Sequence, residues 1–295
     1  MHYILIKIFI RLIALLPLRV AQGVGRFIGL CLYWFPTRLR RNTRINIDLC
    51  WPELNTVEKT NLTKQSLMHT GISILETGAM LCWSKQRLLS LIHSIEGGEQ
   101  LEQAVKQNRG VILLTPHLGC WEIAGLYIGS QYPATFLYKP PKMKALAHWL
   151  TAARQRTGAT LVATDKLGAR QLFKSLKRKR EIIGLLPDQE PPAGNGIFSP
   201  FFGIEANTMT LAVKLARKTG APIIFGFAER LPQGQGYKLF AIDADDKAYN
   251  DDINIAVTAM NRTVEQCIRM APEQYQWSYK RFRQRPDGSR SPYNL

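Results

Sequence analysis

The chain has 295 residues, of which 46% are hydrophobic, and its 39 Lys and Arg against 22 Asp and Glu give a net charge of +17. This length fits one large α/β domain or two small ones, and the apolar content excludes a largely disordered chain. The five cysteines show no CxxC or paired spacing, which argues against structural zinc and indicates a reducing compartment.

The basic residues are concentrated in three stretches of the chain. These are Arg38, Arg40, Arg41 and Arg44; Lys174, Lys177, Arg178, Lys179 and Arg180; and Lys280, Arg281, Arg283 and Arg285. Such clusters attract anionic lipid headgroups, acidic proteins or nucleic acid. Solvated helix faces have the same composition, so the clusters alone do not choose between these partners.

Residues 3–35 are rich in apolar side chains, but Lys7, Arg11, Arg19 and Arg26 interrupt them and Pro17 breaks the run. No stretch of about 18 uncharged apolar residues exists, and the small-residue cleavage site of a secretory signal is missing. We expect a hydrophobic helical membrane anchor that lies in the headgroup region or makes a short span, followed by a basic juxtamembrane segment. The alternative is a helical hairpin packed on the protein's own core. The predicted division is therefore 1–45 for anchor and basic segment, and 46–295 for the main domain.

The remainder of the chain alternates between helical and strand patterns after a first long helix. Helices are predicted at 56–93, 121–130, 142–156, 166–179, 208–219 and 252–270. Strands are predicted at 111–115, 134–138, 160–162, 181–186, 222–228 and 237–242. This alternation predicts an α/β fold with a mixed, largely parallel sheet flanked by helices. The Pro- and Gly-rich segment 232–236 indicates a hairpin, hence one antiparallel edge.

Ligands of such sheets bind in the loops after the carboxyl ends of the strands. Two loops fit that rule: residues 116–122, after the strand at 111–115, and residues 187–190, after the strand at 181–186. In the first, His117 opens a helix and Glu122 follows one turn later. In the second, Asp188 stands before two prolines. The sequence therefore places its candidate reactive groups at one edge of the sheet.

A carboxylate on one imidazole nitrogen fixes the tautomer and raises the basicity of the other nitrogen. Glu122 could fold back in this way onto His117, which would then take a proton from a substrate hydroxyl that attacks an acyl carbonyl. Free amides of Gly119 and Cys120 could stabilise the oxyanion. On spacing alone, a helix-capping His and a Glu that complements the helix dipole are the commoner arrangement. Cys120 leaves open a Cys/His nucleophile pair, although a small buried residue is the more usual role there.

Other catalytic signatures are missing, including GxSxG, GxxxxGK[ST], HExxH and GxGxxG after a strand. This argues against metal, nucleotide and serine hydrolase chemistry. Arg154 and Arg156 lie at the carboxyl end of a predicted helix. A guanidinium at this position either binds phosphate or complements the dipole at the carboxyl end of the helix. Asp188 is either a site residue at a strand end or a turn residue.

An ordered set of motifs resembles the lipid A late acyltransferases, the lauroyl and myristoyl transferases within the lysophospholipid acyltransferase group. The set comprises the greasy amino-terminus, Arg-Arg-Asn-Thr-Arg-Ile-Asn-Ile at 40–47, the His-x4-Glu signature at 117–122, Tyr-Lys-Pro-Pro at 138–141, Arg-x-Arg-x-Gly at 154–158, Leu-Pro-Asp-Gln at 186–189, Pro-Phe-Phe-Gly at 200–203 with Thr208, Leu-Ala-Arg-Lys-Thr-Gly-Ala at 215–221, Pro-Glu-Gln-Tyr-Gln-Trp at 272–277 and Arg281-Phe282. The chain departs from the family pattern at Tyr279, where the family usually has His; this puts acceptor contacts in question but not the reaction class.

The resemblance implies a glycerolipid acyltransferase-like fold and transfer of a fatty acyl chain from acyl carrier protein to a hydroxyl of a lipid A precursor, Kdo2-lipid IVA or its penta-acyl product. It makes His117 the general base and Glu122 its orienting partner. It assigns Arg154 and Asp188 to the headgroup, with Arg156 and Arg230 as further candidates.

The same resemblance implies no cofactor beyond the acyl donor, no nucleic acid partner, and a place at the cytoplasmic face of the bacterial inner membrane. The acidic carrier protein would suit the basic surface around Lys139, Lys142, Lys144 and the 174–180 stretch, and an acyl slot is expected near Phe198, Phe201 and Phe202. Two alternatives stay open: a lysophospholipid or other glycolipid acceptor, and a membrane lipid-binding protein without catalysis.

Overall fold

The centre of the fold is a sheet built around the apolar run Val111–Leu114, whose side chains are all buried. The structure is a computed structural model that describes residues 2–141 and 143–294. Its described strands form a seven-stranded sheet in the order β1 (Ile92–Glu96), β9 (Tyr237–Asp243), β8 (Ile223–Arg230), β2 (Val111–Leu114), β5 (Ile182–Leu185), β3 (Ala134–Tyr138), β4 (Thr160–Ala163). A separate hairpin pairs β6 (Gly196–Phe201) with β7 (Ile204–Met209).

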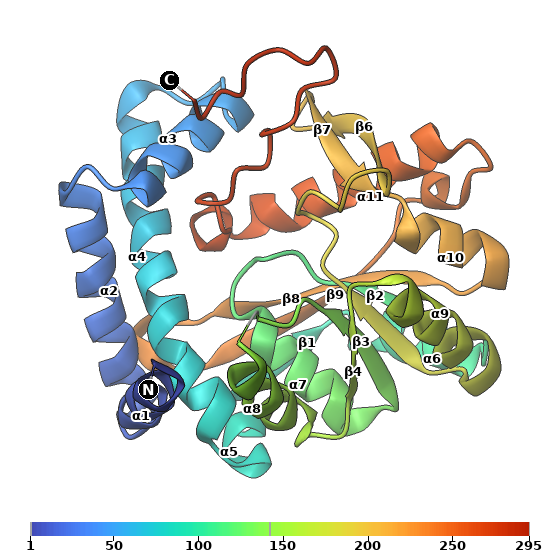
Figure 1. The fold of residues 1–295 in the computed structure, drawn as a ribbon, viewed down its shortest axis with the longest axis horizontal. Helices are drawn as coiled ribbons and strands as arrows, with labels where there is room; N and C mark the ends of the chain where they lie inside the picture. The colour runs from blue at the N-terminus through green and yellow to red at the C-terminus, as the bar shows by residue number, and fades with distance from the viewer. Residues whose placement is uncertain (1, 142, 295) are drawn as a thin grey trace.

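Helices cover both faces of the sheet (Figure 1). They are α1 (His2–Ala14), α2 (Leu18–Trp34), α3 (Arg38–Cys50), α4 (Thr56–Cys82), α5 (Lys85–Leu89), α6 (Gly98–Lys106), α7 (Trp121–Gln131), α8 (Lys144–Gln155), α9 (Lys166–Lys174), α10 (Leu211–Thr219) and α11 (Ile253–Met270). Successive residues of a strand point to opposite faces. Ile112 and Leu114 therefore join the core under α10 and α11, whereas Val111 and Leu113 pack with α6 and α7.

The predicted α/β class with a mostly parallel sheet is confirmed. Strands β8, β2, β5, β3 and β4 run parallel, and β8 pairs with β9 in antiparallel fashion across the predicted hairpin. The hairpin is not the edge of the sheet, because β1 lies outside β9. The sequence pattern missed β1: residues 56–93 were expected to be one helix, but α4 ends at Cys82 and a short α5 precedes the strand.

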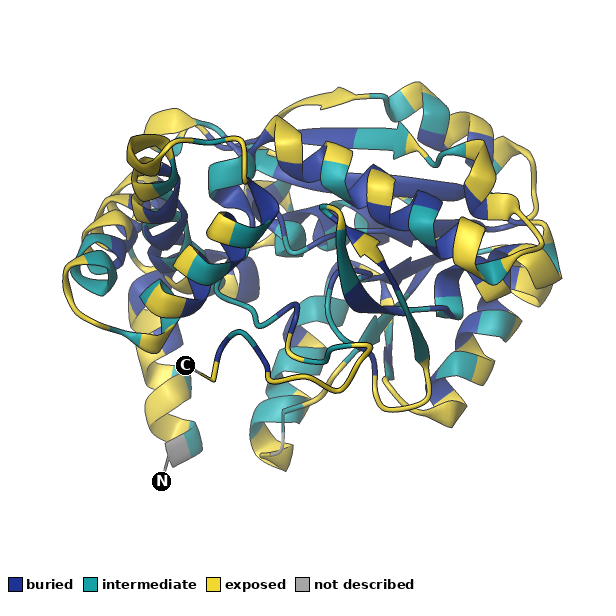
Figure 2. Cartoon of the chain, turned by 90° about the horizontal axis from the view of Figure 1, so that it is seen from above, coloured by how far each residue is buried: buried dark blue, intermediate teal, exposed yellow. Residues whose placement is uncertain are grey.

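The expected amino-terminal membrane anchor is wrong. Pro17 divides the apolar segment into two helices, and among residues 2–141 and 143–294 no helix combines the length and apolar character needed to cross a bilayer. Helix α1 has 13 residues, about 20 Å at the usual rise, against a hydrocarbon core of about 30 Å. The helices instead pack on α4, where the indole Nε1 of Trp83 donates to the Ala14 carbonyl at 2.7 Å. Figure 2 shows α1 as a largely exposed helix at the amino-terminus.

Helices α2 and α4 approach closely because glycines face each other. A Cβ at Gly71 would lie 2.1 Å from the Gly25 carbonyl oxygen, and one at Gly29 would lie 2.3 Å from the Leu67 carbonyl oxygen. No side chain fits between the two backbones at these positions. This contact fixes α4 against the amino-terminal helices, and the opposite face of α4 borders the candidate site described below.

Candidate active site

His117 and Asp188 meet because their loops follow neighbouring strands. β2 and β5 pair in parallel with Leu114 opposite Leu185, so their carboxyl ends lie side by side. The backbone amide of His117 donates to Oδ2 of Asp188 at 2.9 Å, and Nδ1 of the imidazole lies 2.9 Å from Oδ1. The Asp188 side chain is only 2% exposed, whereas that of His117 is 16% exposed. The imidazole therefore sits between a buried carboxylate and the surface.

The charge on Asp188 determines the tautomer of His117. Burial alone would raise the pKa of Asp188, but the facing imidazole and the hydrogen bonds from the His117 ring and amide outweigh it and leave the pKa lowered. An ionised carboxylate only accepts hydrogen bonds, so Nδ1 of His117 carries the proton. In the neutral ring Nε2 then carries the lone pair, and this atom lies 3.2 Å from the Gln189 side-chain amide nitrogen.

Two further residues complete the surroundings of His117. The Trp121 ring packs edge-on against the imidazole with the centroids 5.1 Å apart. The Gln276 amide donates to the His117 carbonyl at 3.0 Å, and its side-chain oxygen accepts from Gln189 at 3.2 Å. The sequence alone assigns no role to Gln189, Gln276 or Trp121. Gln189 directly follows Asp188, but only the strand order shows that this loop meets His117.

Glu122 is paired with Arg154 rather than with His117. Nε of Arg154 donates to Oε2 of Glu122 at 3.0 Å, and Nη2 donates to Oε1, which makes the pair bidentate. The side chains are 24% and 29% exposed, so the pair borders solvent at the start of α7. The structure thus brings four of the predicted residues into two neighbouring pairs, His117 with Asp188 and Glu122 with Arg154.

The amides expected to be free for an oxyanion are already paired. The Gly119 amide donates to the Gln274 carbonyl at 3.1 Å, and the Cys120 amide donates to the Ala228 carbonyl at 2.8 Å. Burial raises the pKa of the Cys120 thiol well above its usual range. Since the thiolate is the reactive form, this environment argues against the Cys/His nucleophile pair.

The other two candidate arginines, Arg156 and Arg230, make hydrogen bonds that stabilise the fold. Arg156 donates through Nε to the Trp83 carbonyl at 3.2 Å, so it satisfies a carbonyl at the carboxyl end of α4. The buried Arg230 pairs through Nε with Glu76 at 2.7 Å and through Nη2 with the Ser73 hydroxyl at 2.6 Å. No described contact joins the guanidinium of Arg156 or of Arg230 to His117.

Several residues that carry the family resemblance join the carboxyl-terminal segment to the rest of the fold. Nδ2 of Asn46 donates to the carbonyls of Trp277 and Tyr279 at 2.6 Å each. The Tyr279 hydroxyl accepts from the Glu190 amide at 3.0 Å, which fixes the loop after β5. Arg281 donates to the Asn207 carbonyl at 2.6 Å. These motifs are therefore structural supports of the site.

Two of the three phenylalanines near which an acyl slot is expected, Phe201 and Phe202, pack on one another. Phe201 is buried, its ring lies 5.1 Å from that of Phe202, and Phe202 lies 5.5 Å from Trp51. The rings fill this region as part of the main core.

Comparison with known proteins shows which family the chain belongs to. The family model described as bacterial lipid A biosynthesis acyltransferase matches residues 1–284. The chain is 31% identical over 284 residues to the lipid A biosynthesis lauroyltransferase of Escherichia coli (strain K12), which covers 96% of this chain and 91% of the relative. It is 30% identical over 279 residues to the palmitoleoyltransferase of the same strain, with 94% and 90% covered, and 26% identical over 287 residues to its myristoyltransferase, with 93% and 83% covered. The resemblance seen in the motifs is confirmed, and the chain belongs to the bacterial lipid A biosynthesis acyltransferases, enzymes that acylate lipid A in lipopolysaccharide biosynthesis.

Proposed function

We propose that the protein moves a fatty acyl chain from acyl carrier protein to a hydroxyl of a lipid A precursor, Kdo2-lipid IVA or its penta-acyl product, with His117 as general base. The observation that carries this proposal is the pairing of His117 Nδ1 with the buried carboxylate of Asp188, which leaves Nε2 as a proton acceptor at the surface of the site. In this assignment Asp188, rather than Glu122, orients the imidazole.

The reaction would proceed in two proton-coupled steps. Nε2 of His117 takes the proton of the acceptor hydroxyl as its oxygen attacks the thioester carbonyl carbon. The tetrahedral intermediate then breaks its carbon–sulfur bond, and the imidazolium returns the proton to the departing thiolate. The products are an ester of the acceptor and the free thiol of the carrier protein. Asp188 stabilises the imidazolium between the two steps.

Glu122 and Arg154 would act on the substrate rather than on His117. A guanidinium has five N–H donors, and Arg154 uses one at Nε and one at Nη2 on Glu122. The remaining donors are in a part-exposed position that suits a phosphate of the acceptor headgroup. Glu122 thereby presents Arg154 in a fixed orientation.

The carrier protein would dock at the edge of the sheet that holds His117. Lys139 directly follows β3, the neighbour of β5, and Lys144 begins α8; both are exposed. The exposed residues Lys177 and Arg178 precede β5 and so belong to the opposite edge. Lys142, the third residue of the expected surface, lies outside the described residues. We therefore assign the acidic carrier protein to Lys139 and Lys144 and not to the 174–180 stretch.

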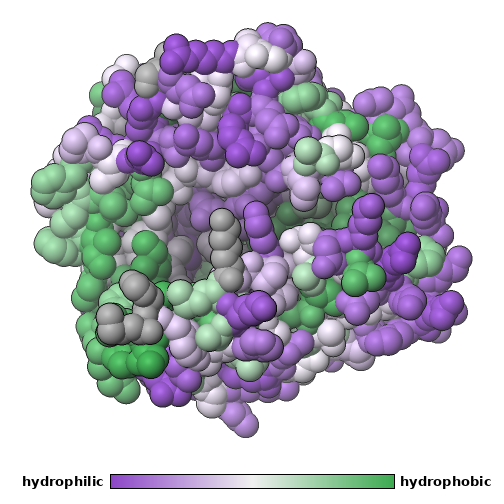
Figure 3. All heavy atoms as spheres, in the orientation of Figure 1, coloured by the Kyte–Doolittle hydropathy of each residue, from purple (hydrophilic) through white to green (hydrophobic). Residues whose placement is uncertain are grey.

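We place the reaction at the cytoplasmic face of the inner membrane. Large apolar side chains of α1 and α2 are exposed and form a continuous apolar area on one side of the molecule (Figure 3). They include Ile4, Leu5, Ile8, Phe9, Leu12 and Phe27. Exposed apolar patches of this kind mark interaction surfaces.

The lipid A mass spectrum of a strain with and without the gene tests the acceptor. Loss of one acyl chain from lipid A in the deletion strain, restored by the gene, is the expected result. An unchanged lipid A spectrum together with altered lysophospholipid or glycolipid species would instead favour the alternative acceptor.

A further inference from the structure

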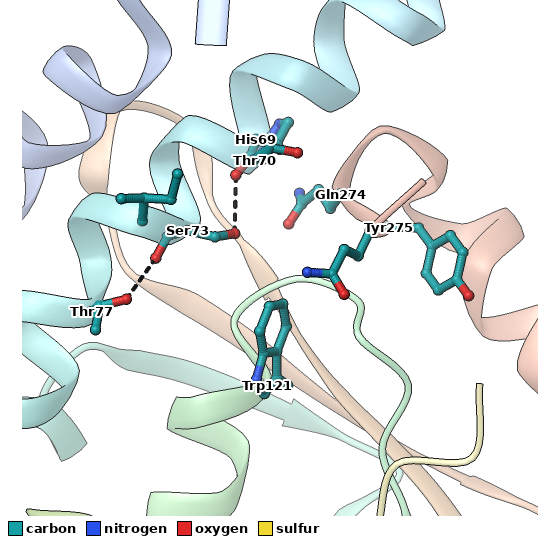
Figure 4. A pocket seen from close by; sticks show the side chains of 9 residues that line it. His69, Thr70, Ser73, Thr77, Trp121, Gln274 and Tyr275 are labelled. Carbon is teal, nitrogen blue, oxygen red and sulfur yellow. Dashed lines mark hydrogen bonds between the residues drawn. The ribbon is translucent and has the colours of Figure 1, made fainter. Parts of the chain in front are cut away.

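A pocket of about 220 Å³ lies beside the His117 site, between α4 and the segment 274–276. Figure 4 shows the arrangement: side chains of α4 line one wall, Gln274 faces them, and Trp121 closes the base. The α4 wall is formed by His69, Thr70, Ser73, Ile74 and Thr77. The pocket is distinct from the contacts of Glu122 and Arg154 described above.

Two lining residues of the pocket adjoin the surroundings of His117. Its lining residue Trp121 packs against the imidazole, with the ring centroids 5.1 Å apart. Its lining residue Gln276 is joined to Nε2 of His117 through Gln189, whose amide nitrogen lies 3.2 Å from both the Gln276 oxygen and Nε2. A molecule in the pocket would therefore contact two residues, Trp121 and Gln276, that adjoin the surroundings of His117.

The lining is polar but carries no charge. None of its described residues is Lys, Arg, Asp or Glu, and three of them present hydroxyls from the same face of α4. Burial, with the nearby charges of Arg230 and Arg26, lowers the pKa of His69 to about 3, so this side chain is neutral at physiological pH. A phosphate or an ammonium group would find no counter-charge here, whereas hydroxyl and amide groups would find hydrogen-bond partners.

One buried polar atom of a lining residue, Nδ1 of His69, has no hydrogen-bond partner among the described residues. A buried polar atom without a partner costs about 1–3 kcal/mol, so such atoms are usually satisfied by water or ligand. His69 therefore has capacity for one hydrogen bond that the described residues do not use.

We propose that this pocket binds an uncharged, hydroxyl- or amide-bearing segment of one of the two substrates. This inference rests on the proposed function, which supplies two sources of that chemistry: the amide-containing arm that carries the acyl thioester, and the sugar and hydroxyacyl part of the acceptor. The volume is below the roughly 300–1,000 Å³ of pockets that enclose a whole drug-sized ligand, so it suits one segment of a larger molecule.

The variant that tests the pocket is the double substitution Thr70→Val and Thr77→Val. Both hydroxyls donate only to carbonyls of α4 itself, at 3.0 and 3.1 Å, so their loss leaves the tertiary hydrogen bonds intact. Val keeps the volume of Thr. The matched control is Thr60→Val, an exposed position of α4 with the same type of bond, to the Thr56 carbonyl at 2.7 Å.

Steady-state acyl transfer is measured with acyl carrier protein as donor and the lipid A precursor as acceptor. We expect the double variant to raise KM for one substrate roughly tenfold, in line with the loss of two neutral hydrogen bonds, while kcat and the Thr60→Val control stay within about twofold of wild type. The substrate whose KM changes identifies the source of the segment. Unchanged KM values for both substrates would overturn the proposal.

Equilibrium binding of the same two substrates in a His117→Ala background gives a readout independent of turnover. The double substitution should weaken one of them about tenfold. If the parent protein binds neither substrate, the proposed function fails and the assignment fails with it. If the parent binds both and the double variant binds them equally well, only the pocket assignment fails.

Discussion

The amide and the imidazole Nδ1 of His117 reach the two different oxygens of Asp188, each at 2.9 Å. One carboxylate thus fixes both the backbone and the ring of the proposed base, across the loops that follow β2 and β5. This double contact supplies two hydrogen-bond donors to the buried carboxylate of Asp188 and so favours its ionised form.

Asp188→Asn keeps the shape of this side chain but can donate to Nδ1, which favours the wrong tautomer of His117. We expect kcat for acyl transfer to fall by about 10²–10⁴ with little change in KM. Kinetics at saturating donor and acceptor measure this. Glu190→Gln is the control in the same loop, since Glu190 contacts Arg283 and not His117; an equal loss in both variants would contradict the assignment.

The same substitution should change acid stability. The lowered pKa of Asp188 in the folded protein means that its ionised form stabilises the fold above the ordinary carboxyl pKa of about 3.9, and that this stabilisation is lost as the pH falls through the folded value. Denaturant unfolding at a series of acidic pH values should therefore show a flatter pH dependence in Asp188→Asn than in wild type.

Glu122 and Arg154 should behave as a unit. Glu122→Gln and Arg154→Gln are each expected to lower kcat/KM roughly 10- to 100-fold, because each leaves a charged partner without its hydrogen bonds. The double variant should lose little more than the worse single one. Losses that simply add would show that the two residues act separately. Removing the exposed pair of Glu102 and Lys106 serves as a control without effect on activity.

Lys139→Glu with Lys144→Glu should raise KM for the acyl carrier protein donor about tenfold at low salt, and the difference should shrink as salt is added. The matched variant Lys177→Glu with Arg178→Glu reverses the same charge at the opposite edge of the sheet and should leave KM near the wild-type value. The docking assignment is wrong if the matched variant impairs the donor as much.

Gly71→Ala should destabilise the protein by about 1–3 kcal/mol, because its Cβ would lie 2.1 Å from the Gly25 carbonyl oxygen and force α2 away from α4. A Cβ at Gly23, in the partner helix α2, would meet no atom within 4 Å, so Gly23→Ala should stabilise that helix by roughly 0.5–1 kcal/mol. Chemical denaturation measures both. A Gly71→Ala protein as stable as wild type would rule out the close approach of these helices.

The sequence predicted the parts of this fold that depend on local pattern. The buried run at 111–114, the alternation of strands and helices and the 232–236 hairpin have local signatures, and each is found. The order of the strands has no such signature. Two candidate loops were recognised, but the contact of His117 with Asp188 follows from the pairing of β2 with β5, which the sequence does not encode locally.

Proximity in sequence did not predict the partner of Glu122. Glu122 lies close to His117 along the chain, yet its carboxylate is held by Arg154 from α8. The apolar composition of the amino-terminal residues indicated a membrane anchor. Hydropathy does not show the glycine contacts that bring α2 onto α4, because these contacts depend on residues far apart in the sequence. The hydrogen bonds of Gln189 and Gln276 around His117 likewise depend on how the loops fold together, so the sequence alone does not predict them.

The most direct test of the central claim is the turnover number of His117→Ala in acyl transfer from acyl carrier protein to the lipid A precursor. We expect kcat to fall by roughly 10²–10⁴, because the proton acceptor is removed, and the melting temperature to stay near that of wild type. Turnover close to the wild-type value in the folded variant would contradict it.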